Sequence, residues 1–359
     1  MTDADGGPAG PAPDQPGEDQ LGADQLSLSR RLRQPRTIVS LVLPIVLLAL
    51  FVRSLPGFKL DELPGKILQA NPLLLLAALS VFYLGFPLRG LRWAILVRRT
   101  GYDLAVRDAS EIIFLSWLVN CLVPAKLGDV YRAWLLKINS PVSLSRTFGT
   151  VFIERVLDLF AIVVLGLAAG FVSFRTGLPG EVQIVFAIGV AFVILLAGGL
   201  LTMRNLGRRL LVRLPLPARA LELYDRFEEG VFASIGLSAL PRLVILTGLI
   251  WGTEAMRLYL VVQALGFPIH LGISGAFFVA LSASLLTAVP LTPAGIGFVE
   301  GGVVGLLSLV YAVPQTEALA ITLVDRALSV LSIIILGSIA YAISPKRRGL
   351  GIRASPATT

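Results

Sequence analysis

The sequence predicts an all-α protein that crosses a membrane several times. Only 15% of its 359 residues are charged and 55% are hydrophobic, whereas soluble globular chains carry about 25% charged residues. Several apolar runs approach the roughly 20 residues that a helix needs to span a bilayer. Two further apolar runs are interrupted by proline and glycine at corresponding places. We therefore expect six full spans and two broken, re-entrant helical hairpins, arranged as an inverted repeat.

The two ends of the chain differ from the rest in composition. Residues 1–28 are rich in Gly, Pro, Asp and Gln, and they contain too few apolar residues to form a core. We expect them to be a disordered N-terminal tail, and their acidic character excludes a signal peptide. The membrane domain should cover residues 29–345, and residues 346–359 should form a basic cytoplasmic tail.

The apolar runs define the expected spans. Full spans are expected at 37–52, 72–97, 147–172, 183–203, 241–266 and 318–343. The run 109–137 has only about 15 apolar residues before Pro124, too few to cross a bilayer, so its tip should turn back inside protein or a wet cavity. The run 272–313 breaks at "VPLTPAGIG" (289–297), where prolines and glycines end a helix. Its halves would form either a second hairpin or two full spans.

The distribution of charge predicts the orientation of the chain in the membrane and the class of its binding partners. Basic residues cluster at 30–36, 98–107, 137–146, 204–242 and 346–353. The positive-inside rule then places both termini in the cytoplasm, with 204–240 as a cytoplasmic linker that includes a surface helix. The net charge of +8 suits anionic headgroups rather than nucleic acid. One cysteine and one histidine exclude a disulfide framework and a Cys/His metal cluster, and we expect no cofactor.

Three matches in order indicate an internal repeat. "PAKLG" at Pro124 recurs as "PAGIG" 169 residues later, and "IERVLDLFAIVVLG" recurs as "VDRALSVLSIIILG" 171 residues later. Arg89 matches Arg257 at a spacing of 168. Residues 72–172 and 241–343 therefore read as two copies of one unit, and an odd number of chain reversals between them would invert one copy. Inverted repeats with interrupted helices are typical of transporters that alternate access around a central site.

Charged residues inside the apolar runs are the candidate site. Each costs about 2.5–3.5 kcal/mol at a helix centre, so they should face the interior and find partners or water. We expect matched neighbour pairs, Glu154–Arg155 and Asp325–Arg326, with helix-to-helix salt bridges as the alternative. Glycine amides at the tips would suit a phosphate, with simple turns as the alternative. The full set of candidate substrate-path residues is Arg89, Arg92, Pro124, Lys126, Gly128, Asp129, Arg132, Glu154, Arg155, Asp158, Glu254, Arg257, Pro293, Gly295, Gly297, Glu300, Asp325 and Arg326.

Four blocks carry a family resemblance: "RGLRW", "LVPAKLGDVYRAWLL", "FIERVLDL" and "PLTPAGIGFVEGGVVGLL". They resemble the signature blocks of the lysylphosphatidylglycerol synthase transmembrane-region family, flippase-like membrane proteins that include the membrane part of the multiple peptide resistance factors. The resemblance implies a helical bundle with re-entrant segments that moves lipids or lipid-linked molecules between leaflets. It also implies that both tips and the spans after them line the path. This chain has Ala125 and Ala294 where such tips often carry glycine, and Asp129 where glutamate is usual.

Three functions remain open at this point. The first is a flippase for a phospholipid or lipid-linked substrate in the cell membrane. The second is a non-transporting membrane partner of a separate lipid-modifying synthase or glycosyltransferase. The third is an intramembrane enzyme that uses Glu154, Asp158, Asp129 or Glu300 as acid or base. Because the chain ends shortly after its last expected span, we expect no soluble catalytic domain and no aminoacyl-lipid synthase activity.

Overall fold

The computed structural model of the protein describes residues 62–123, 127–174, 180–203, 217–236, 238–269, 271–287, 292–349 and 355–356, together with 207, 209, 212 and 213. These residues are almost all helical, which confirms the all-α class. Two short strands in this part of the chain, β1 (Tyr102–Asp103) and β2 (Ser355–Pro356), pair antiparallel. The predicted tail 1–28 and the predicted span 37–52 lie outside the described residues.

Four helices are long and apolar enough to cross a membrane. They are α4 (Pro72–Arg99), α7 (Leu144–Ser173), α11 (Leu240–Leu265), and the continuous run of α14 (Gln315–Arg326), η4 (Ala327–Leu331) and α15 (Ser332–Ile343). They match four of the six predicted spans. The prediction at 183–203 corresponds to α8 (Gly180–Thr202), in which the apolar helical stretch Phe186–Thr202 is shorter than these four.

Local sequence signals explain where these helices begin and end. Asn71 precedes α4, and its side-chain oxygen accepts a hydrogen bond from the amide of Leu73 at 2.9 Å, while Pro72 takes the first helical position, where no amide is needed. Ser143 caps α7 in the same way, because its hydroxyl accepts from the amide of Arg146 at 3.1 Å. At the C-terminal end of α11, Gly266 adopts the left-handed conformation that commonly ends helices.

The first broken run forms a hairpin of two short helices, α5 (Val106–Leu122) and α6 (Leu127–Asn139). Val123 has an extended backbone after α5, as expected for a residue before proline. Gly128 lies against α5 so closely that an added Cβ would collide with the carbonyl oxygen of Ser116. The hairpin therefore depends on glycine for its tight crossing.

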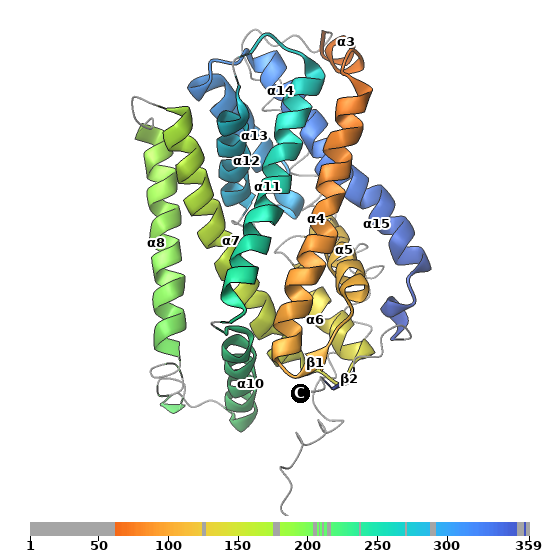
Figure 1. Ribbon diagram of the computed structural model, residues 1–359, viewed down its shortest axis with the longest axis vertical. Coiled ribbons are helices and arrows are strands. Elements are labelled where there is room, and N and C mark those ends of the chain that lie inside the picture. Colours follow the sequence, from red (N-terminus) through yellow and green to blue (C-terminus); the bar gives the residue numbers. More distant parts are fainter. Residues whose placement is uncertain are drawn as a thin grey trace, which may run out of the picture.

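The second broken run consists of α12 (Ile273–Thr287), the 3-10 turn η2 (Pro293–Gly295), α13 (Phe298–Gly305) and the π-helix η3 (Leu306–Val310). Both apolar stretches, 273–287 and 298–310, are shorter than the four long helices. In Figure 1, α5 and α6 occupy the lower half of the bundle, while α12 and α13 occupy the upper half. The two broken runs therefore lie toward opposite ends of the bundle.

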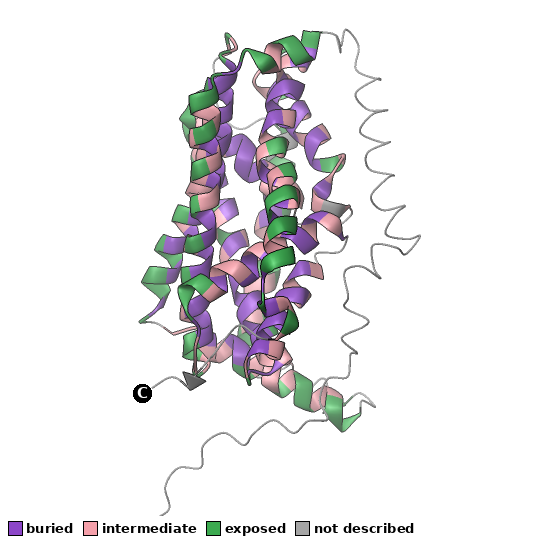
Figure 2. Ribbon diagram, turned by 90° about the vertical axis from the view of Figure 1, so that its right-hand side faces the viewer, coloured by how far each residue is buried: buried purple, intermediate pink, exposed green. Residues whose placement is uncertain are grey.

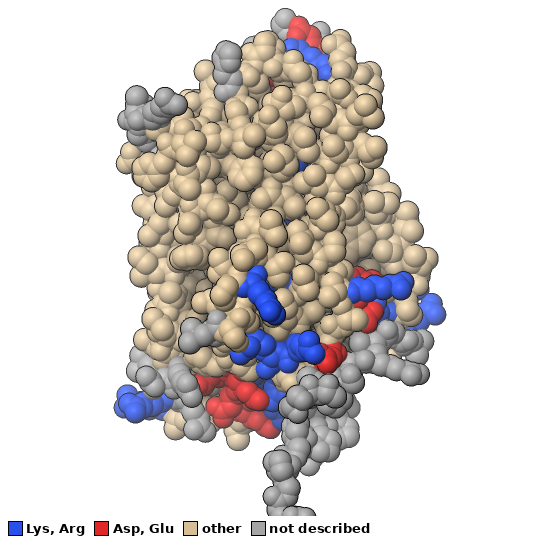
Figure 3. All heavy atoms as spheres, in the orientation of Figure 1, with Lys and Arg blue, Asp and Glu red and all other residues tan. Residues whose placement is uncertain are grey.

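Packing joins these elements around a common interior. α4 lies along α11, and α7 packs between α12 and the lower helix α10 (Ala218–Ser234); the short helix α3 (Glu62–Leu68) touches α14 at the upper end. Figure 2 shows buried residues on the inner sides of the helices and exposed residues on their outer sides. Figure 3 shows a broad face almost free of charge, with charged side chains gathered below it, near α10 and β1, and at the upper tip. This distribution is that of a protein whose middle faces lipid.

Candidate functional site

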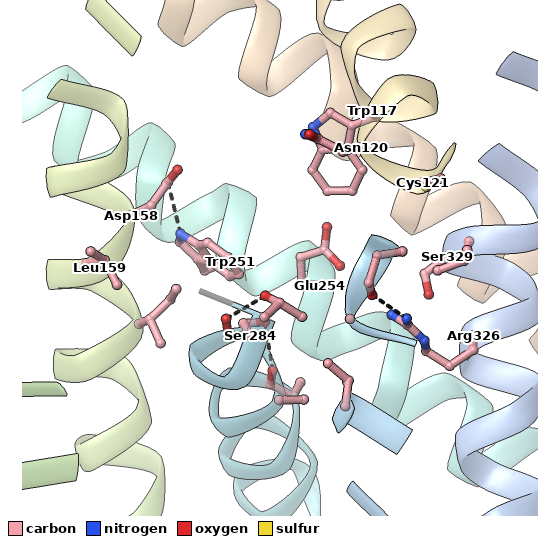
Figure 4. A pocket seen from close by; sticks show the side chains of 18 of the residues that line it. Trp117, Asn120, Cys121, Asp158, Leu159, Trp251, Glu254, Ser284, Arg326 and Ser329 are labelled. Carbon is pink, nitrogen blue, oxygen red and sulfur yellow. Dashed lines mark hydrogen bonds between the residues drawn. The ribbon is translucent and has the colours of Figure 1, made fainter. Parts of the chain in front are cut away.

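A cavity of about 480 Å³ lies between the two hairpins and is lined by residues from both of them and from α7, α8, α11 and α14. Figure 4 shows residues from separate elements around this space, among them Asn120 of α5, Asp158 of α7, Glu254 of α11 and Arg326 of α14. The cavity therefore joins parts of the chain that are more than two hundred residues apart in sequence.

The lining of the cavity divides into a charged part and an apolar part. Its charged residues are Asp129, Arg155, Asp158, Glu254, Arg257, Asp325 and Arg326. Its apolar residues include Leu159 and Ile162 of α7, Phe192 and Leu196 of α8, and Val303 of α13. A ligand with a polar end and an apolar end would find a matching surface for each.

Behind the charged part of the lining lies a buried cluster between α4, α6 and α7. Arg92 donates to Asp158 at 2.6 Å and to Glu154 at 3.3 Å, and Arg132 of α6 also pairs with Glu154. The side chain of Glu154 is only 2% exposed. Because an isolated buried charge is costly, Arg132 depends on Glu154, whereas Arg92 is shared between Glu154 and Asp158.

Each hairpin tip is tied to the long helix that follows it. Arg155 of α7 forms a forked pair with Asp129 of α6, with Nη2 and Nε donating at 2.8 and 3.0 Å. Arg326 of α14 donates to Glu300 of α13 at 2.6 Å and to the carbonyl oxygen of Ala294 at 2.5 Å. Both arginine–carboxylate pairs join residues 26 positions apart. We call them the first and the second tip pair.

A third group of ion pairs connects the two parts of the proposed repeat along α4 and α11. Arg89 of α4 donates to Glu254 of α11 at 2.7 Å. Glu254 also accepts from Arg257 at 2.5 Å, and Arg257 forms a forked pair with Asp325 at 2.8 and 3.0 Å. These contacts form a continuous charged line from α4 to α14.

Aromatic rings cover several of the buried arginines. The guanidinium of Arg89 lies 4.6 Å from the ring centre of Trp117, and that of Arg132 lies 4.8 Å from Trp93. Arg257 lies 5.0 Å from Phe82. Such cation–π contacts add attraction where water is excluded.

The twelve charged candidates that lie in the described part of the chain all take part in these ion pairs, which we call the network. Six of them are arginines, Arg89, Arg92, Arg132, Arg155, Arg257 and Arg326. The other six are carboxylates, Asp129, Glu154, Asp158, Glu254, Glu300 and Asp325. Seven of the twelve, with Gly295, line the cavity, whereas Arg89, Arg92, Arg132, Glu154 and Glu300 lie behind it. Pro124 and Lys126 lie outside the described residues.

Two expectations about partners are wrong. Glu154 pairs with Arg92 and Arg132 instead of Arg155, and Asp325 pairs with Arg257 instead of Arg326. Neighbours in a helix point about 100° apart, so they cannot face each other. The helix-to-helix alternative describes these contacts.

The backbone amides at the tips, which we expected to bind a phosphate, already donate hydrogen bonds within the protein. The amide of Gly128 donates to the side-chain oxygen of Asn120 at 2.9 Å, and the amide of Gly297 donates to Glu300 at 2.6 Å. Gly295 and Gly297 both have positive φ, which glycine adopts without strain. Pro293 begins the turn η2.

Sequence reasoning missed several polar residues of the site. The indole nitrogen of Trp251 donates to Asp158 at 3.1 Å, and the hydroxyl of Thr247 accepts from Arg92 at 2.9 Å. Both lie on α11 at spacings of three and seven residues before Glu254, which is the spacing of one helix face. That periodicity was the available signal.

The arrangement is that of a helical membrane protein with a charged, partly apolar cavity at the meeting point of two broken hairpins. The chain belongs to the family described as Lysylphosphatidylglycerol synthase TM region, which matches residues 37–337. This confirms the resemblance seen in the sequence. Within the described residues, no group of three or more His, Cys, Asp or Glu side chains is placed to hold a metal ion.

Curated relatives agree with this family. The chain is 37% identical over 229 residues to the UPF0104 membrane protein MJ1078 of Methanocaldococcus jannaschii, covering 63% of this chain and 93% of that one. It is 26% identical over 314 residues to a UPF0104 membrane protein of Methanothermobacter thermautotrophicus, covering 81% and 90%. It is 28% identical over 333 residues to glycosyltransferase AglD of Haloferax volcanii, covering 82% of this chain but only 52% of AglD.

Proposed function

We propose that the protein moves a phospholipid or a lipid-linked molecule between the leaflets of the cell membrane. The observation that carries this proposal is the cavity between two opposed hairpin tips, which combines a charged lining with an apolar one. A lipid needs this combination, because its headgroup must leave water while its chains stay in an apolar environment.

The proposal includes an inverted repeat of residues 72–172 and 241–343 with both termini in the cytoplasm. The two tip pairs support it, since both join residues 26 positions apart and recur at a spacing of 171 residues. The position of the two broken runs toward opposite ends of the bundle also supports it (Figure 1). Alternating access would then exchange the roles of the two hairpins.

Single cysteines test this topology. In a Cys121→Ser background, Gln69→Cys and Pro314→Cys should react with an impermeant thiol reagent added to intact cells, whereas Pro141→Cys and Ser238→Cys should not. All four positions are exposed in the structure, so lack of reaction reports sidedness rather than burial. Labelling of Pro141→Cys from outside would rule out the inverted arrangement.

Lipid movement is tested in vesicles. Purified full-length protein is reconstituted with acyl-labelled phospholipids, and an impermeant quencher measures how fast label leaves the inner leaflet. We expect faster exchange than in protein-free vesicles, and loss of that exchange in Glu300→Gln, which keeps the shape of the side chain but removes its charged pair with Arg326. If the wild-type protein moves none of a broad lipid panel, the proposed function is wrong.

A second candidate function is favoured by one relative. Because this chain aligns with about half of a protein named glycosyltransferase AglD, it would act as the membrane partner of a separate glycosyl-transfer enzyme. Co-purification with such an enzyme, together with no lipid movement in vesicles, would support this alternative. An acid–base enzyme is disfavoured, because each of the six carboxylates is in an ion pair with arginine.

A further inference from the structure

The apolar interior of the bundle is divided into separate cores. One core gathers buried side chains of the second hairpin with those of α11 and α14, among them Phe278 and Leu319. Another core gathers buried side chains of the first hairpin with those of α4, among them Trp93 and Leu115. A smaller core lies at the lower end, between α7, α10 and the adjoining ends of α4 and α11. Each hairpin therefore has an apolar core of its own.

The last long helix contributes to both of the larger cores. Val324 of α14 is buried in the core of the second hairpin, and Leu328 of η4 packs against the same core. Ile333 of α15 is buried in the core of the first hairpin, and Val330 of η4 packs against that one. The helix therefore passes from one core to the other within η4.

η4 is also the place where the hydrogen bonding of this helix changes. The amide of Ser332 donates to the carbonyl oxygen of Ala327, five residues earlier, whereas an α-helix joins residues four apart. Such π-segments are rare, usually a single turn long, and frequent at functional sites. The irregular turn and the change of core coincide.

Below η4, α15 is fastened to the first hairpin (Figure 1). A Cβ added at Gly337 would lie 3.1 Å from the Cβ of Leu118 on α5, so the two helices touch closely. At the end of α15, the hydroxyl of Ser344 donates to Glu111 of α5 at 2.5 Å, and Lys346 pairs with the same carboxylate. Above η4, α14 packs instead against α11 and α13.

Several contacts between the two sides are ion pairs. Arg89 of α4 pairs with Glu254 of α11 at 2.7 Å, and Arg132 of α6 pairs with Glu154 of α7. Interfaces between parts that move are more polar than permanent ones, because polar groups can exchange one partner for another. The apolar packing within each core has no such replacement.

We propose that η4 is a hinge, and that the first hairpin and α15 move as one body relative to α14 and the second hairpin. The last span then belongs to two bodies, and its π-helical turn takes up the change of backbone angles, as the few residues of a hinge do. Because the cavity lies between the two hairpins, movement about η4 changes its width. The hinge does not depend on which molecule the protein carries.

Distances between spin labels test the hinge in the full chain. Cysteines in a Cys121→Ser background carry nitroxides at four exposed positions, and double electron–electron resonance measures three pairs. Val106→Cys with Ile339→Cys lies within the first body, and Gln263→Cys with Pro314→Cys lies on the other side of η4. Both pairs should give one narrow distance. Gln263→Cys with Ile339→Cys, the pair across η4, should give a broader or double distribution.

A variant at the boundary sharpens this measurement. Asp129→Asn removes the charge that pairs with Arg155 between α6 and α7, and it should shift the distribution across η4 but not the distance within the first body. Glu317→Gln removes a carboxylate that pairs with Lys66 on the side of α14, and it should leave the distribution across η4 unchanged. A narrow distribution across η4 in both the wild type and Asp129→Asn would overturn the inference.

Hydrogen exchange locates the hinge without any label. In the wild-type protein the amides of 327–331 should exchange faster than those of α14 and α15, because the π-helical turn opens most easily. A disulfide between Leu118→Cys and Gly337→Cys, whose Cβ atoms are close enough to be joined, fastens α15 to α5 within one body and should leave this fast exchange unchanged. Equal protection along the whole helix, or slow exchange in the disulfide variant, would contradict a hinge at η4.

Neither measurement requires lipid movement. A protein that moves no lipid in vesicles but shows both signatures would lose the proposed function and keep the hinge. Lipid movement with equal protection and narrow distances would remove the hinge alone.

Discussion

The two hairpins meet at the same cavity but differ in regularity. The first consists of two ordinary α-helices, α5 and α6, whereas the second is divided among α12, η2, α13 and the π-helical η3. Ala294, at the second tip, has φ of 51°, an unusual value for a residue with a Cβ. Two buried hydroxyls of the second hairpin, on Ser282 and Ser308, have no hydrogen-bond partner among the described residues.

The two ends of the bundle differ as well. Lys346, after α15, is only 4% exposed and pairs with Asp108 at 2.8 Å and with Glu111, both on α5, while the side chain of Asn139 at the end of α6 donates to its carbonyl oxygen. At the opposite end of the bundle, Lys66 of α3 pairs with Glu317 of α14 at 2.5 Å but is 27% exposed. The first hairpin is thus held at its base by buried contacts, whereas the second contains the π-helix η3. We expect the second hairpin to be the element that deforms.

The largest expected difference concerns the carboxylates that follow the two tips. Glu154→Gln should destabilise the protein by about 3–5 kcal/mol, because Arg132 has no other ion pair in the described structure. Asp325→Asn should cost clearly less, because Arg257 keeps Glu254. Thermal unfolding of the full chain in detergent measures both.

Removing both members of the buried pair provides the control. Glu154→Leu combined with Arg132→Met should recover part of the stability lost in Glu154→Gln, since no buried charge is then left alone on α6. Equal losses of stability in Glu154→Gln and Asp325→Asn would show that the ion pairs of Glu154 and those of Asp325 stabilise the protein equally.

The next largest difference in stability is expected between variants of Lys346 and of Lys66. Lys346→Met leaves Asp108 and Glu111 without their buried partner and should cost about 3 kcal/mol. Lys66→Met should cost about 1 kcal/mol or less, because it leaves one carboxylate, Glu317, rather than two neighbouring ones, and because the Lys66 side chain is 27% exposed and screened. Unfolding midpoints that fall equally would mean that the base of the first hairpin is not held more firmly than the opposite end of the bundle, where Lys66 joins α3 to α14.

The breaks and the buried charges could be predicted from sequence, whereas the partners could not. Proline and glycine in an apolar run mark a break wherever they occur, and a charge in such a run must face inward, so the tips and all twelve charged residues were predictable. The partner of Glu154 lies 22 residues away on α6 or 62 away on α4, and only helix packing brings these together. The left-handed backbone of Ala294 could not be predicted from alanine, which does not favour it; the available signal was the glycine that similar tips often carry at this position.

Glycine should matter differently at the two tips. A Cβ at Gly128 would collide with the backbone of Ser116, so Gly128→Ala should cost about 2 kcal/mol by forcing α5 and α6 apart. At Gly295 the nearest atom to a new Cβ belongs to the side chain of Val299, which can rotate. Gly295→Ala therefore carries mainly the cost of its positive φ, about 1–2 kcal/mol. A smaller loss for Gly128→Ala than for Gly295→Ala would argue against the rigid first hairpin.

The smallest expected effect is a gain, from Ala294→Gly. The left-handed conformation at Ala294 costs about 1–2 kcal/mol for a residue with a Cβ, and glycine removes that cost. Replacing alanine by glycine also raises the conformational entropy of the unfolded chain. This destabilises the folded protein by about 0.4–1 kcal/mol and offsets part of the gain. We therefore expect a stabilisation of about 0.5 kcal/mol, with the bond from Arg326 to the carbonyl oxygen of residue 294 retained because it involves only backbone atoms of that residue.

A matched change at a helical position gives the opposite sign. Ala187 lies exposed within α8, where Ala187→Gly should cost about 1 kcal/mol. If the second tip deforms during lipid movement, Ala294→Gly should also change the rate of that movement, while Ala187→Gly should leave it unchanged. Destabilisation of both variants to the same extent would show that the tip is not strained. This result would contradict the expectation that the second hairpin is the element that deforms.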